Sequence, residues 1–321
     1  MKDKICNITT GRKMVTLLLF LVISVGQFYA KTPYSDKLLK KANSGNAQAQ
    51  YELGMALSEG NGVEKDYKAG VSWIEKSANQ GYRDAQSMMG DICYFNNQEF
   101  AKAAQWWRLA SDKGDLEAAF NLSLLYKWGS GVEKDLSRSV RYLKIAAEGG
   151  HSDAMYNLSN YYERGDGVAQ DWSKCHFWRT KAADLGQSAA CYNLAHDYLY
   201  GHPAVKPDKD KALGFMHKAE ELGYPVAMLV LGEAYYQGGE YAGGKHDYAK
   251  AVGYLNKFLE NSRSMEMDNE WMGTAYLILS KCYRFGRGVD ADEYEADRLY
   301  RKAKAYEVTD EKMDRIIEEL R

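Results

Sequence analysis

The chain has 321 residues, of which 45% are hydrophobic and only 4 are proline, and its formal net charge is −2. This composition is typical of a folded chain with a large apolar core, and it excludes a low-complexity polypeptide. The charged residues among the first thirty contribute +3, so the remainder carries −5. A mildly acidic remainder argues against nucleic acid or anionic lipid as the main partner.

The first thirty residues differ in kind from the rest. Basic residues precede an apolar run from Met14 to Val25, which is short for a membrane-spanning helix of about 20 residues. The pattern predicts that residues 1–30 are a secretory signal peptide, cleaved near Gly26 or Ala30. A retained signal anchor is the alternative. We therefore expect a periplasmic or secreted protein with no stable membrane insertion after cleavage.

Most of the remaining chain is built from one pattern, seen clearly between Ala154 and Gly186. An alanine, a leucine and a tyrosine at four-residue spacing place one apolar stripe on a helix, and two glycines end that helix in a turn. A second helix then starts near an aspartate. The defining residues are Ala154, Leu158, Tyr162, Gly165, Gly167 and Asp171. Each unit is thus a helical hairpin that cannot bury its apolar edges alone.

Comparison of the sequence with itself finds this pattern seven times. The second unit lacks the Gly-x-Gly-Val turn, and the sixth has an enlarged one. The position five residues after the opening alanine is always small, which predicts close approach of the two helices of a hairpin. Tyr162 and its equivalents are expected to fill the space between helices. The units are 49–84, 85–117, 118–153, 154–189, 190–226, 227–274 and 275–306.

The run A-x-x-x-L-G-x-x-Y-x-x-G-x-G-V-x-x-D, followed by K-A-x-x-W and K-A-A-x-x-G, resembles the Sel1-like repeat, a relative of the tetratricopeptide repeat. The resemblance extends from about Ser35 to Tyr306. It implies an all-α fold, a right-handed superhelical solenoid of antiparallel helix pairs. It is specific for architecture and says little about function, because members do many jobs on this scaffold.

Two terminal segments are predicted to cap the array. Residues 31–48 match only the second half of a repeat, so they would cover the N-terminal apolar edge. Residues 307–321 would form a C-terminal capping helix. Its apolar face would carry Met313, Ile316, Ile317 and Leu320.

A partner-binding surface is expected on the first helices, which line the concave face in stacked hairpins of this kind. Two positions after the opening alanine stand the aromatic residues Phe120, Tyr156 and Tyr192. The next position carries Asn121, Asn157 and Asn193. Asparagines can hold the backbone of an extended peptide, and aromatics supply flat contact area. The alternative is that these asparagines only satisfy neighbouring turns.

Further along the same helices, one equivalent position near the turn holds Trp128, Arg164 and Tyr200. Tryptophan, tyrosine and arginine are enriched in binding hot spots. Leu229, Val230, Leu277 and Ile278 in units six and seven suggest a second, apolar patch or a dimer contact, which leaves homo-oligomerisation open.

The four cysteines after the signal peptide are too few for a disulfide in every repeat, so we expect free, largely buried thiols. The chain contains no H-E-x-x-H, G-x-S-x-G or comparable catalytic motif. No enzyme activity, metal or cofactor is therefore predicted.

The sequence favours a non-catalytic scaffold or adaptor in the bacterial cell envelope, which binds a partner protein or extended peptide. Two alternatives stay open from the resemblance. One is an immunity protein that neutralises a secreted toxin, and the other is an envelope enzyme of the penicillin-binding hydrolase type.

Overall fold

The computed structural model describes residues 32–262 and 267–306. The predicted signal peptide and C-terminal capping helix lie outside the described residues. The described chain divides into two compact units, the N-terminal unit of residues 32–181 and the C-terminal unit of residues 182–306. Regular structure in the described residues is helical, apart from one antiparallel bridge between His202 and Val205. The predicted all-α class is confirmed.

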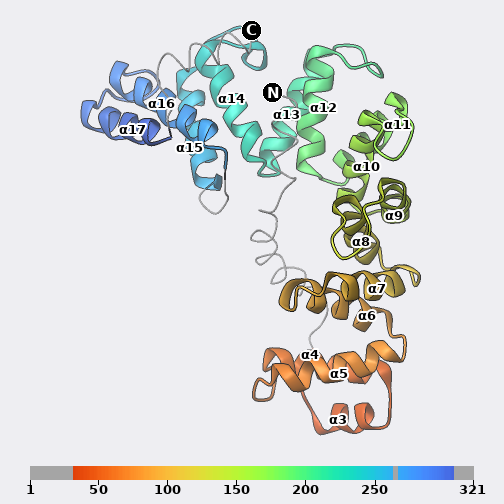
Figure 1. Cartoon of the computed structure of the whole chain (residues 1–321). Helices are drawn as coiled ribbons and strands as arrows, with labels where there is room; N and C mark the ends of the chain where they lie inside the picture. The colour runs from red at the N-terminus through yellow and green to blue at the C-terminus, as the bar shows by residue number, and fades with distance from the viewer. Residues whose placement is uncertain (1–31, 263–266, 307–321) are drawn as a thin grey trace. The chain divides into compact units, whose positions relative to one another are not determined.

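Each repeat is a pair of helices, and Figure 1 shows the two members side by side, as in α4 and α5. The first helices are α4 (Ala47–Glu59), α6 (Arg83–Asp91), α8 (Leu116–Trp128), α10 (Ser152–Arg164), α12 (Ser188–Tyr200), α14 (Pro225–Gln237) and α16 (Asn269–Phe285). The second helices are α5 (Tyr67–Asn79), α7 (Phe100–Ser111), α9 (Leu136–Glu148), α11 (Trp172–Asp184), α13 (Lys209–Glu221), α15 (Tyr248–Asn261) and α17 (Glu293–Ala305).

The repeated aspartate begins the second helices because its carboxylate accepts a backbone hydrogen bond from the residue three positions on. Asp171 accepts from the Lys174 amide at 2.9 Å, and Asp135 does the same for Arg138 at 2.9 Å. The same cap recurs at Asp66, Asp208, Asp247 and Asp292. The second helices therefore start where the sequence pattern predicts.

The two turn glycines serve different purposes. Gly165 adopts φ +76° and ends α10, and a Cβ there would meet neighbours only at 3.5 Å or more. Gly167 adopts φ +64°, and a Cβ there would lie 2.5 Å from the backbone carbonyl of Leu136, the first residue of α9. The second glycine thus lets the turn of one repeat rest on the second helix of the preceding repeat.

Close approach within each hairpin explains the small residue at the fifth position after the opening alanine. A Cβ on Gly54 would lie 2.7 Å from the carbonyl oxygen of Gly70, and one on Gly232 would lie 2.7 Å from Leu255. Beside this contact the tyrosines stack across the hairpin. Tyr126 lies 5.7 Å from Tyr142 in a nearly parallel arrangement. The expected close approach is confirmed.

The N-terminal half-repeat forms α3 (Asp36–Asn43), which Ser35 caps by accepting the Leu38 amide. Leu38 and Ala42 on this helix pack against Ala49 and Leu53 of α4. The apolar edge of the first repeat is thereby covered.

Repeat two replaces the missing glycine turn with a π-helix, η1 (Ile92–Asn96), and Gln98 takes the positive φ of 55°. The amide of Glu99 then donates to the carbonyl of Cys93 at 2.8 Å before α7 begins. The hairpin closes with fewer residues because the helix widens instead of stopping.

Alanine substitution at the two turn glycines of repeat four should separate conformational strain from close packing. Gly165→Ala should cost about 1–2 kcal/mol of unfolding free energy, the price of a left-handed backbone for a residue with a Cβ. Gly167→Ala should cost at least about 3 kcal/mol, because it adds a clash with the backbone of α9. Urea denaturation measures both. Equal losses would contradict the packing role of Gly167.

Candidate functional site

Two of the aromatics expected to face a partner lie inside the repeat stack. Phe120 is 9% exposed and stacks on the His151 ring at 4.7 Å. Tyr192 is 2% exposed and packs against Tyr224 at 5.3 Å. In each case the partner is the residue that precedes the next first helix. The expectation that Phe120 and Tyr192 offer flat contact area is therefore wrong, since neighbouring repeats use those faces. Tyr156 is half-buried.

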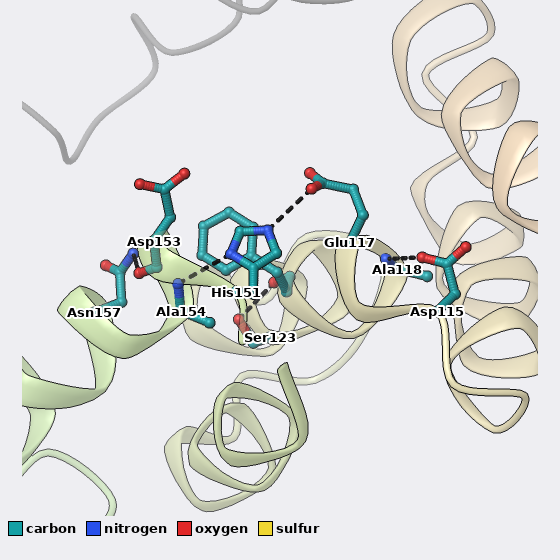
Figure 2. Close-up of polar contacts among 9 residues, drawn as sticks. Asp115, Glu117, Ala118, Ser123, His151, Asp153, Ala154 and Asn157 are labelled. Carbon is teal, nitrogen blue, oxygen red and sulfur yellow. Dashed lines mark hydrogen bonds and ion pairs between the residues drawn. The ribbon is translucent and has the colours of Figure 1, made fainter. Parts of the chain in front are cut away.

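His151 joins repeats three and four through three contacts (Figure 2). Its Nδ1 accepts the Ala154 amide at 3.2 Å and caps α10, so Nε2 donates to Glu117 at 2.9 Å. Burial lowers the pKa of His151, but the hydrogen bond and charge of Glu117 raise it to a net increase. The cap opposes protonation because it needs the Nδ1 lone pair.

The three asparagines are all half-buried but differ in their contacts. The Asn157 side-chain amide donates to the Asp153 carbonyl of its own helix at 2.9 Å, as Figure 2 shows. Asn193 has a polar or electrostatic contact within the chain. Asn121 makes no hydrogen bond among the described residues. Asn121 thus has a whole side-chain amide available to a partner, and Asn157 keeps its carbonyl oxygen.

The residues near the turns are exposed. Trp128 is 49% exposed at the end of α8, and Tyr200 is 66% exposed at the end of α12. Arg164 is exposed at the end of α10. The Lys127 ammonium lies 4.9 Å above the Trp128 ring, and burial lowers the pKa of this lysine. A cation and an aromatic face are therefore presented together beside the turn of repeat three.

The apolar patch expected in units six and seven is absent. Leu229 is 3% exposed, and Leu277 and Ile278 are fully buried, so these side chains belong to the core. Val230 is half-buried. The letters that suggested a second patch mark tighter packing of the last repeats.

Sequence reasoning missed three charged residues at positions that other repeats fill with apolar side chains. Arg179 is 1% exposed at the position that holds Leu143 in repeat three. Its guanidinium donates to Glu163 at 2.8 Å and to Asn160 at 3.4 Å. Register comparison between repeats could have found it, because a charge at a repeating core position breaks the pattern.

The other two are carboxyl groups at the position six residues after the opening alanine. Asp91 accepts a hydrogen bond from Trp107 Nε1 at 3.1 Å. Burial raises the pKa of Asp91 to about 7, although the Trp107 bond lowers it. Burial also raises the pKa of Glu233 to about 7.

Within the described part of the chain, no group of three or more His, Cys, Asp or Glu side chains could hold a metal ion. Cys93, Cys175, Cys191 and Cys282 are free and buried, as expected. No helix among the described residues is long and apolar enough to cross a membrane.

The model of the Sel1 repeat matches the chain seven times and accounts for most of it. The matched segments are 47–82, 83–115, 116–151, 152–187, 188–224, 225–262 and 273–305. The chain belongs to the Sel1 repeat family. The predicted seven-repeat solenoid is confirmed. Sel1 repeat proteins generally mediate protein–protein interaction and are generally non-catalytic.

Two solved structures share this fold. A Sel1 repeat protein from Oxalobacter formigenes is 24% identical, with a TM-score of 0.69 over 88% of this chain and 79% of that one. A protective antigen of uropathogenic Escherichia coli with an SLR fold is 23% identical, with a TM-score of 0.59 over 86% and 68% of the two chains.

A curated relative from Rattus norvegicus, DAP3-binding cell death enhancer 1, is 28% identical over 37% of this chain. This chain spans only 30% of the length of that relative. The similarity reflects shared Sel1 repeats.

The buried charge pair of repeat four should respond asymmetrically to substitution. Glu163→Ala leaves the Arg179 guanidinium buried without its counter-charge and should cost about 3 kcal/mol of unfolding free energy. Arg179→Met, the residue at the matching position 216, should be neutral or stabilising. Glu99→Ala at the exposed pair with Lys102 is the control and should cost less than about 1 kcal/mol. Similar losses for both glutamates in chemical denaturation would refute this view of the pair.

The raised pKa of Asp91 should make stability depend on pH. Because the folded state holds this proton up to about pH 7 and the unfolded state releases it near pH 4, the unfolding free energy should fall as pH rises between those values. Asp91→Asn keeps an oxygen for Trp107 but cannot ionise. We expect it to match the wild type at pH 4 and to exceed it at pH 8 in urea denaturation. An unchanged difference at the two pH values would disprove this assignment.

Proposed function

We propose that this Sel1 repeat protein is a non-catalytic scaffold that binds a partner protein or extended peptide on the exposed face of its first helices. The observation that carries the proposal is the pair of aromatics at first-helix ends, Trp128 and Tyr200, which are 49% and 66% exposed. Exposed large aromatics at matching places of a repeat scaffold are typical of binding hot spots. The family's general role in protein–protein interaction supports the same function.

The binding surface is narrower than the sequence suggested. It comprises Trp128 and Arg164 in the N-terminal unit and Tyr200 in the C-terminal unit, with Asn121 and Asn157 as polar contacts. Asn121 has no internal hydrogen-bond partner among the described residues, so it can both donate to and accept from a peptide backbone. Phe120 and Tyr192 would support this surface from beneath.

The location of the protein is part of the proposal. A basic segment followed by a short apolar run supports export to the cell envelope, with residues 1–30 removed. The partner would then be an envelope or secreted protein.

The test is cross-linked affinity capture from envelope extract, followed by mass spectrometry. The Trp128→Ala/Tyr200→Ala variant should weaken capture of the partner at least about tenfold, because truncating a hot-spot aromatic costs on the order of 2 kcal/mol. A Phe177→Ala/Tyr294→Ala variant is the matched control. It removes aromatics that are 51% and 76% exposed on second helices, and it should capture normally.

Loss of the partner by the control variant, with retention by the first, would move the interface to the second helices. The intact mass of the captured protein also shows whether the chain starts after Gly26 or Ala30. A cognate toxin as the captured protein would make the scaffold an immunity protein.

A further inference from the structure

Glu233 on α14 lacks the internal partner that its counterparts in other repeats have. At the same repeat position, Asp91 receives a hydrogen bond from Trp107 at 3.1 Å, and Asn160 receives one from Arg179 at 3.4 Å. Both donors stand at one matching position of the second helix. In repeat six that position is Leu255, which is fully buried and cannot donate.

No basic side chain compensates Glu233 among the described residues. The carboxylate makes neither an ion pair nor a hydrogen bond there, and burial is the sole cause that raises its pKa. Lys209 is engaged by Glu240 at 2.6 Å. The Glu233 side chain is still partly accessible, so a cation from outside can reach it. An ionised carboxylate in this position is costly unless a cation pairs with it.

Aromatic rings from α12, α14 and η2 (Glu240–Ala242) surround this carboxyl group. The His196 ring lies 4.6 Å from Tyr192, 5.7 Å from Tyr200 and 6.2 Å from Tyr241. The field of Glu233 reaches Tyr192, together with those of Tyr200 and Tyr241. The four rings and Glu233 therefore belong to one cluster within the C-terminal unit.

Tyr241 supplies a second unsatisfied polar group. Its side chain is 5% exposed, and its hydroxyl has no hydrogen-bond partner among the described residues. A buried hydroxyl without a partner is expensive. The cluster thus holds a carboxylate and a phenol oxygen that both lack a donor, next to the exposed face of Tyr200.

We propose that Glu233, Tyr241 and Tyr200 form a subsite that receives the guanidinium of an arginine side chain presented by the partner. This inference rests on the proposed function, since the arginine belongs to the bound protein. The carboxylate neutralises the charge, the phenol oxygen accepts an N–H, and Tyr200 covers the planar cation. Arginine fits better than lysine because its flat guanidinium stacks on an aromatic face while donating in several directions.

The subsite can be tested without the partner, by ligand-observed NMR of the whole processed protein with N-acetyl-arginine amide. N-acetyl-citrulline amide has the same shape and no charge. At pH 8, above the pKa of Glu233 of about 7, the arginine amide should bind at least about tenfold more tightly than the citrulline amide. Glu233→Gln should weaken arginine binding at least about tenfold, and Tyr241→Phe about threefold. Asp91→Asn removes the counterpart that has an internal partner, and it should bind as the wild type does.

Equal binding of the two amides, wild-type affinity in Glu233→Gln, or no arginine binding up to about 50 mM would each overturn the subsite. Tyr241→Phe keeps the test decisive if Glu233→Gln fails to fold. The result is separate from the proposed function, because no partner is present in this assay. Arginine binding together with normal capture by the Trp128→Ala/Tyr200→Ala variant would uphold the subsite and reject the proposed surface.

Discussion

The fold depends on the inability of a single helical hairpin to bury its own apolar edges. Each repeat must therefore lie close against the one before it, and the second turn glycine makes this contact possible. At Gly167 the backbone of repeat four rests on the first residue of α9, where no Cβ fits. The remaining conserved spacing within the chain follows from this contact. The aspartate cap fixes where the second helix starts, and the small fifth residue fixes how near it approaches the first.

The same contact explains which aromatics remain available to a partner. Phe120 and Tyr192 lie where one first helix meets the start of the next, so neighbouring repeats bury them. Trp128 and Tyr200 lie one helix length away, beyond that contact, and stay exposed. Binding capacity in this protein is therefore concentrated at the ends of the first helices, where the stack makes no demand on side chains.

Polar residues at core positions individualise otherwise similar repeats. Repeat four buries Arg179 against Glu163, repeat two pairs Asp91 with Trp107, and repeat six leaves Glu233 facing Leu255. The first two are satisfied within their own hairpin and act on stability. The third is not satisfied, and that difference separates a structural polar residue from a candidate binding group.

The sequence by itself determined the helix class, the seven repeats, the turn positions and the helix starts, because these follow from local spacing that every repeat shares. It also determined that the described cysteines are free, since their number and spacing leave no pairs. Only the tertiary structure decided which face of Phe120, Tyr192, Leu277 and Ile278 is covered, because burial at a repeat junction depends on the neighbouring repeat. The partner of each charged core residue was likewise decided in three dimensions. Asp91 and Glu233 occupy the same repeat position, and only the residue opposite, Trp107 or Leu255, makes one satisfied and the other open.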